Sequence, residues 1–211
     1  MLFRISESFS SSVDISRTEV AKTCNQCHKN AHEKLDNVLN KSMMKTGNTN
    51  APVCTDCHGV HKIYSSKLDI QTQACLKCHL DEKKFPGEEK GSAKFVAEYK
   101  TSVHGMLTGK DNKQAALCTD CHGNHELDDP KNPGNAKMKA NLMETCGKCH
   151  ADEVVKFKNS AHGKAYLSGD IKDAPSCTSC HGEHNIKNVA STEKFSKINT
   201  SDMCLTCHKG G

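Results

Sequence analysis

The sequence lacks most of what a chain of 211 residues normally uses to build an interior. It has no Trp, only 4 per cent aromatic residues, and 35 per cent hydrophobic residues, of which fourteen are cysteines. No apolar run is long enough to cross a membrane. Such a chain cannot bury a side-chain core of ordinary size, so another material must fill its interior.

Arginine is nearly absent as well, since Arg4 and Arg17 are the only two, and lysines are scattered along the chain. Without clustered cations and interleaved aromatics, nucleic-acid binding has no support. No Gly-rich phosphate loop occurs. Residues 1–23 hold no apolar run of the signal-peptide kind, so a removed leader, a misassigned start and a piece of a longer product all stay open.

What the sequence has in excess is cysteine, and every cysteine belongs to a C-x-x-C-H motif. The seven motifs, numbered here as copies 1 to 7, are Cys24/Cys27/His28, Cys54/Cys57/His58, Cys75/Cys78/His79, Cys118/Cys121/His122, Cys146/Cys149/His150, Cys177/Cys180/His181 and Cys204/Cys207/His208. This spacing is the attachment signature of c-type haem, where two thioethers hold the porphyrin and the adjacent histidine ligates iron. On a helix, positions i, i+3 and i+4 share one face, so the three side chains can approach one porphyrin together.

Zinc ribbons and thiol redox sites also contain C-x-x-C pairs, but neither requires histidine after the second cysteine. Here that residue is His in all seven copies, although only 13 of 211 residues are His. We therefore expect seven covalently bound haems c and folding that is coupled to their attachment. With ionised propionates the formal charge of +4 becomes 4 − 7 = −3 in the ferric state and 4 − 14 = −10 in the ferrous state.

The copies are of two kinds that alternate along the chain. Three Gly-His copies read C-T-x-C-H-G-x-H, at 54–61, 118–125 and 177–184, and four plain copies lack the Gly and the second His. Two stretches, TSVHGMLTG (101–109) and NSAHGKAYLSG (159–169), share an S-x-H-G frame, and KSMMKTG (41–47) occupies the same place in the first repeat. The chain thus reads as repeated two-haem units, about 24–74, 75–145 and 146–211, after a motif-free segment 1–23.

We expect a single elongated domain over 24–211, made mainly of short α-helices and irregular loops wrapped around a stacked chain of seven haems, with little or no β-sheet. The lysine-, acid-, Gly- and Pro-rich segments 81–94 and 126–140 are predicted loops.

Seven irons need seven distal ligands, and six histidines remain outside the motifs: His32, His61, His104, His125, His162 and His184. The last histidine of a Gly-His copy cannot reach the far face of its own haem, but it can reach a neighbouring one if Gly59, Gly123 or Gly182 turns the chain. His104 and His162 recur in matched frames, which favours axial ligation.

Two ligand assignments stay open at this point. His32 has no counterpart in the other plain copies, so a surface histidine is the alternative to a ligand. Aligning Ser42 with Ser102 and Ser160 places Met44 where the other frames have His, which makes Met44 the candidate seventh ligand. Lys41 and Lys45 are its rivals.

The paired motifs, with CTDCHGVH and TSVHG among them, resemble the multihaem c-type cytochromes of respiratory bacteria and archaea from Cys24 to His208. The resemblance implies low-spin, mostly bis-His haems stacked in a chain, working as periplasmic or extracellular electron carriers between redox partner proteins. The sequence departs from this group at Met44.

Electron transfer without bond-making chemistry is the function that this ligand count favours. One alternative is a multihaem reductase with an open haem, but all seven motifs are standard and no Arg follows position 17. Another is a subunit of an extracellular cytochrome filament or respiratory complex, in which His32 could be donated between copies of the chain.

Overall fold

The computed structural model describes residues 17–35, 51–81, 83, 91–109, 114–125, 139–188 and 197–209. Every regular element in these ranges is helical, and none of them contains a strand. The α-helices are α1 (Arg17–Asn25), α2 (Lys29–Leu35), α4 (Cys54–His58), α5 (Lys67–Ile70), α6 (Leu76–His79), α7 (Gly91–Thr101), α8 (Val103–Leu107), α9 (Cys118–His122), α10 (Leu142–Gly147), α11 (Ala151–Asn159), α12 (Ala161–Ser168), α13 (Cys177–His181) and α14 (Lys197–Leu205). The expected fold of short helices and loops is confirmed for this part of the chain.

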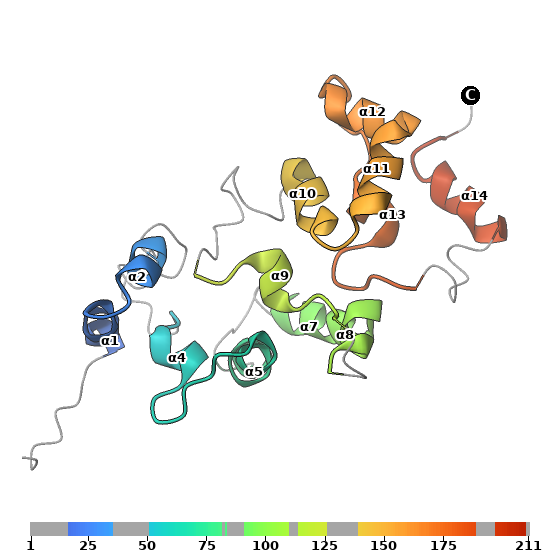
Figure 1. The fold of residues 1–211 in the computed structure, drawn as a ribbon. Coiled ribbons are helices and arrows are strands. Elements are labelled where there is room, and N and C mark those ends of the chain that lie inside the picture. Colours follow the sequence, from blue (N-terminus) through green and yellow to red (C-terminus); the bar gives the residue numbers. More distant parts are fainter. Residues whose placement is uncertain are drawn as a thin grey trace, which may run out of the picture.

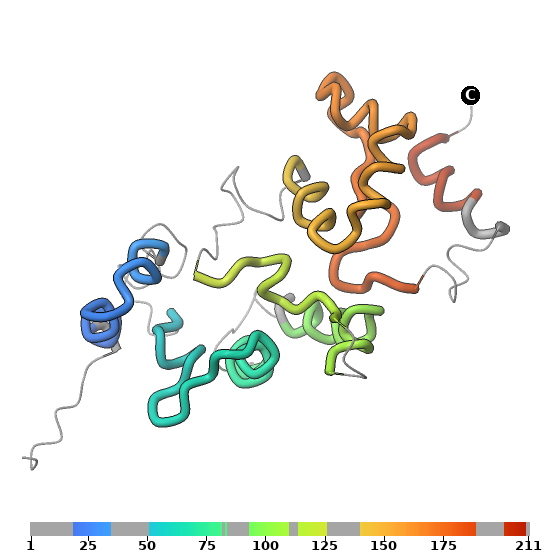
Figure 2. Tube along the Cα trace, viewed as in Figure 1, coloured from blue at the N-terminus to red at the C-terminus, as the bar shows by residue number. Residues whose placement is uncertain are grey.

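The helices are strung out along the course of the chain, without a common centre (Figure 1). α1 contacts α4, and α9 contacts α10. In Figure 2 the coloured stretches of the tube follow one another from the blue N-terminal helices to the red C-terminal helix. Among the described helices none combines the length and apolarity that a membrane span needs.

Few apolar side chains are buried in the described ranges. The buried ones are Ala51, Val53, Ala74, Met143 and Ala174. Larger side chains such as Ile63 and Val155 are more than half exposed, at 64 and 57 per cent. Because most of the buried side chains are small, the polypeptide removes little apolar surface from water by itself, as the composition predicted.

Each Gly-His copy folds as one five-residue helix, α4, α9 or α13. All three helices begin alike, because the side chain at the third helical position accepts a hydrogen bond from the N–H of the residue before the first cysteine. The pairs are Asp56 with Val53 at 2.7 Å, Asp120 with Leu117 at 2.8 Å and Ser179 with Ser176 at 3.0 Å. The Asp or Ser within the motif therefore satisfies a backbone donor at the helix start.

The same three helices end at glycines with positive φ, namely Gly59 (79°), Gly123 (76°) and Gly182 (81°). Their ψ values lie within a few degrees of 180°. The predicted positive φ is confirmed, but the conformation differs from the expected left-handed helical one: it is the extended region that essentially only glycine adopts. The chain therefore leaves each motif extended, and this carries the last histidine away from its own copy.

Three plain copies place the first cysteine near the end of a helix and the histidine just beyond it. In copies 1, 5 and 7 the histidine N–H donates to the carbonyl of the first cysteine at 2.9 Å. The expected i, i+4 relation is thus kept where the regular helix stops. Copy 3 differs, because a π-helical turn η1 (Gln71–Cys75) leads directly into α6.

The S-x-H-G frames join two helices through one serine. Ser102 begins α8 by accepting from Gly105 N–H at 3.1 Å, and it donates to Tyr99 O at 2.6 Å. Ser160 begins α12 with the same bonds to Gly163 (3.0 Å) and Phe157 (2.7 Å). A Cβ on either glycine would collide with the backbone of Tyr99 or Phe157. Serine and glycine therefore fix the backbone around His104 and His162.

Candidate functional site

All fourteen cysteines are thiols in this structure, and none of them belongs to a disulfide. Thioether attachment of haem stays a prediction for each of them. In the described ranges no three or more His, Cys, Asp or Glu side chains converge in the manner of a metal-ion site.

The second cysteine of each motif, predicted to form a haem thioether, is here a thiol whose exposure differs between the copies. It is exposed in copies 1, 4, 5 and 7, and half-buried in copies 2, 3 and 6. The exposed ones are Cys27, Cys121, Cys149 and Cys207, and the half-buried ones are Cys57, Cys78 and Cys180.

The first cysteines lie deeper in several copies. Cys24, Cys118 and Cys146 are half-buried, whereas the second cysteines of the same copies are exposed. In copies 2, 3 and 6 both cysteines are half-buried, and in copy 7 both are exposed. In copies 1, 4 and 5 the two cysteines of one motif therefore differ in exposure, although they lie a single helical turn apart.

Four motif histidines lie close to a histidine from another part of the chain, and in every case the partner is a predicted distal ligand. The ring centres are 5.9 Å apart in His58–His125, 5.8 Å in His122–His184, 6.2 Å in His104–His150 and 5.9 Å in His162–His208. The two ring planes of a pair are inclined by between 16° and 39°. These four imidazole pairs combine segments far apart in the sequence.

The separations can be compared with those of two imidazoles that bind one metal ion from opposite sides. A ligating nitrogen lies about 2.0–2.1 Å from the metal and about 1.1 Å from its own ring centre, so the centres should be about 6.2–6.4 Å apart. The observed 5.8–6.2 Å is close to this range. The ring centres of the four pairs are therefore nearly as far apart as those of two imidazoles on opposite sides of one metal ion.

A backbone contact orients the ring of His58. Its Nδ1 lies 2.9 Å from the carbonyl oxygen of Tyr64, while Tyr64 N–H donates to the His58 carbonyl at 2.7 Å. Because a carbonyl only accepts, Nδ1 carries the proton, and the lone pair resides on Nε2. Such a bond from the second ring nitrogen is the usual support of a metal-bound histidine.

The environment of His104 favours its uncharged form. Burial lowers the pKa of His104, and the neighbouring imidazole of His150 lowers it further. Neutral imidazole is the form that ligates metals.

The His122–His184 pair includes a neighbour that the sequence did not point to. Phe95 of α7 packs on the His184 ring with 4.9 Å between ring centres. Nδ1 of His184 is buried and has no hydrogen-bond partner in the described part of the chain. No spacing or motif connects Phe95 with copy 6, because the contact arises from the path of α7.

The remaining predicted ligands are not brought into these pairs. His61 is exposed, and His32 lies in α2, where its N–H donates to the His28 carbonyl at 3.1 Å. Met44 lies outside the described residues. His28, His79 and His181 are likewise not members of the four pairs.

Plain and Gly-His copies meet at their first cysteines. Burial and the adjacent Cys24 thiol raise the pKa of Cys54. A hydrogen bond between Cys75 and Cys118 raises the pKa of Cys118 and lowers that of Cys75 to about 7. Burial and then the nearby Cys177 thiol raise the pKa of Cys146 to about 11. The first cysteines of copies 1 and 2, of copies 3 and 4 and of copies 5 and 6 are thus neighbours. Cys57 also lies near Cys75, and Cys121 near Cys149, so copies 1 to 6 adjoin one another in chain order.

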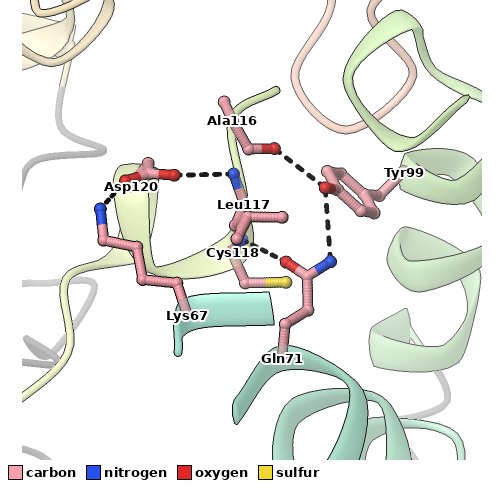
Figure 3. Close-up of polar contacts among 7 residues, drawn as sticks. All are labelled: Lys67, Gln71, Tyr99, Ala116, Leu117, Cys118 and Asp120. Atoms are coloured by element: carbon pink, nitrogen blue, oxygen red, sulfur yellow. Dashed lines mark hydrogen bonds and ion pairs between the residues drawn. The ribbon is translucent and has the colours of Figure 1, made fainter. Parts of the chain in front are cut away.

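A polar network ties copy 4 to copy 3 (Figure 3). Gln71, 2 per cent exposed, accepts from Cys118 N–H at 2.7 Å and approaches the Tyr99 hydroxyl at 3.5 Å. The Tyr99 hydroxyl donates to Ala116 O at 2.9 Å. The segment before Cys118 is therefore fixed by side chains from η1 and α7, two contacts that sequence reasoning missed.

Lys67 of α5 adds an ion pair with Asp120 to the same network. Partial burial opposes ionisation of Asp120, but hydrogen bonds from Lys67 and Leu117 N–H outweigh it and lower the pKa of the carboxyl group. Asp120 therefore both starts α9 and joins it to α5.

Comparison with known proteins supports haem attachment at the C-terminal copies. A family model described as Doubled CXXCH motif matches residues 170–211, which contain copies 6 and 7. No curated protein and no solved structure matches the chain. The chain thus carries, at least in this segment, the paired C-x-x-C-H motifs that imply covalently bound c-type haem.

Proposed function

We propose that this chain is a multihaem electron-transfer protein in which each of the seven copies holds one haem c. The observation that carries the proposal is the set of four pairs, each with one motif histidine and one distal histidine at 5.8–6.2 Å. Haem c supplies reversible one-electron chemistry when bound. The chain supplies two thiols and one imidazole at each copy, and a second imidazole at four of them.

Two imidazoles on one iron leave no position for a substrate, and this argues for electron transfer over a reductase. Met44 completes the proposed ligand set, because its place in the first frame matches those of His104 and His162. His32 and His61 are the other distal ligands that we propose.

The alternation of plain and Gly-His copies supports the two-haem units at 24–74, 75–145 and 146–211, and the first cysteines of neighbouring plain and Gly-His copies lie close together. In copies 3 and 4 the side chains of Cys75 and Cys118 are neighbours, so porphyrins attached there would lie side by side. Because covalent haem attachment takes place outside the cytoplasmic membrane, we place the protein in the periplasm or outside the cell. Its redox partners should meet a net negative surface, since the haem propionates outweigh the formal charge of +4.

The proposal is tested by producing the chain in a host that attaches haem c. Mass spectrometry should show seven porphyrins, and low-temperature magnetic spectra should show low-spin irons with at least four bis-imidazole signals. A bare or zinc-loaded polypeptide would exclude the proposal. Stoichiometric carbon monoxide binding to the reduced wild-type protein would favour the reductase alternative.

A further inference from the structure

We infer that the distal histidines follow a fixed register along the repeats. Where one Gly-His copy follows another, its last histidine ligates the iron of the earlier one. The histidine of an S-x-H-G frame ligates the iron of the plain copy that comes after the next Gly-His copy. The inference rests on the proposed function and names which segment completes which iron.

Two Gly-His copies place their last histidine beside the motif histidine of the preceding Gly-His copy. His125 follows the motif histidine of copy 4 by three residues, yet its ring lies 5.9 Å from that of His58 in copy 2. His184 stands at the same place after copy 6 and lies 5.8 Å from His122 in copy 4. Both displacements run toward the N-terminus and span one two-haem unit.

The histidines of the two S-x-H-G frames lie beside motif histidines that come later in the sequence, so their displacement runs toward the C-terminus. His104 precedes copy 4 in the sequence but lies 6.2 Å from His150 in copy 5. His162 precedes copy 6 and lies 5.9 Å from His208 in copy 7. Each frame thus passes over the following Gly-His copy and reaches the plain copy after it.

The local backbone is the same at equivalent positions of the two repeats. Gly123 and Gly182 adopt nearly the same φ, 76° and 81°, so the two Gly-His peptides leave their helices in the same way. Ser102 and Ser160 hold the two frames with matching hydrogen bonds. The two copies of each element therefore start from the same local geometry, and the chain between them follows the same displacement in both repeats.

One consequence is that a single peptide holds two irons. The Cα atoms of His122 and His125 can be at most about 11 Å apart, because three residues span about 3.3–3.6 Å each. The porphyrins of copies 2 and 4 must then be neighbours, and those of copies 4 and 6 likewise. Copy 4 is placed between them.

The register is tested with His125→Ala in two backgrounds, the full holoprotein and a chain with Cys54→Ala and Cys57→Ala, which lacks the haem of copy 2. In the full holoprotein the variant should gain one carbon-monoxide-binding haem per chain. In the second background this gain should disappear, because the iron that His125 completes is gone. A gain of one site in both backgrounds would overturn the register.

His184→Ala is the matched control, since its target is copy 4. His184→Ala should still gain one carbon-monoxide-binding haem when copy 2 lacks its haem. This gain should disappear when Cys118→Ala and Cys121→Ala remove the haem of copy 4. If His125→Ala does not fold, His125→Met can replace it, because methionine is also an iron ligand. This variant should shift the reduction potential of one haem, and only when copy 2 carries its haem. A shift in the chain without that haem would overturn the register. Failure of the proposed function is separable, because it appears earlier as missing haem in the mass spectrum of the wild-type chain.

Discussion

Among single residues, the glycine after each Gly-His helix decides where the following histidine goes. Gly182 has φ 81°, and a Cβ there would collide with the Asn185 side chain. Because only glycine tolerates this conformation, Gly182→Ala should lower the free energy of unfolding by about 1–3 kcal/mol, as measured by thermal or denaturant unfolding. It should also disturb ligation by His184.

Gly169 is the matched control for this substitution. Its φ is 72°, and an added Cβ would meet nothing within 4 Å, so Gly169→Ala should cost only about 1 kcal/mol through the left-handed backbone. Equal losses in the two variants, with unchanged spectra in both, would contradict the role of Gly182.

The Tyr99 hydroxyl distinguishes the second unit from the third, where Phe157 occupies the same place in the frame. Its bond to Ala116 O is 2.9 Å long, so Tyr99→Phe leaves that carbonyl without its donor. We expect the free energy of unfolding to fall by about 1 kcal/mol, measured with denaturant.

Tyr64→Phe serves as the comparison, because Tyr64 contacts His58 through its backbone. This variant should change stability much less than Tyr99→Phe does. The reverse order of the two losses would refute the network of Figure 3.

Among the helices, Asp120 in α9 predicts a dependence on pH. Its pKa is lowered in the folded protein, so its contribution to stability is complete above the unfolded pKa and is lost as the pH falls through the folded one. Lys67 and Asp120 are partly exposed, with 62 and 30 per cent of their side-chain surface accessible. The ion pair should therefore add no more than about 0.5–1 kcal/mol.

Asp120→Ser separates the helix start from the ion pair, because Ser179 performs the first role in α13 at 3.0 Å. At neutral pH Asp120→Ala should lose about 1 kcal/mol more than Asp120→Ser does. The melting temperatures of wild type and Asp120→Ser should converge in acid, and a difference that is constant with pH would contradict the ion pair.

Much of the helical structure could be predicted from the sequence, and its long-range contacts could not. The C-x-x-C-H spacing identifies local turns, because the bonds from His to the first cysteine span four residues. The capping role of Ser102 is equally local. Which iron His125 faces depends on the path of about sixty intervening residues, and no periodicity encodes it. Gln71 and Tyr99 carry no motif at all, so their bridge becomes visible only in three dimensions.

Across the entire chain, the irons should differ in potential. Met44 lies outside the described residues, and its proposed role as a ligand rests on the frame alignment. Thioether ligation raises a haem's potential, so Met44→His should lower the highest step of a redox titration. Met43→His, one position away in the sequence, is the control and should leave that step unchanged. If only Met43→His lowered that step, Met43 and not Met44 would be the ligand.

The last histidine of each Gly-His copy has a consequence for how electrons would move along the protein. Copies 2, 4 and 6 would be linked directly. Copy 3 also adjoins copies 2 and 4, because Cys75 lies near Cys57 and Cys118. Copy 5 adjoins copies 4 and 6, because Cys149 lies near Cys121 and Cys146 near Cys177. A current crossing the protein would then have parallel routes. Damage to one plain copy would slow the passage of charge without interrupting it.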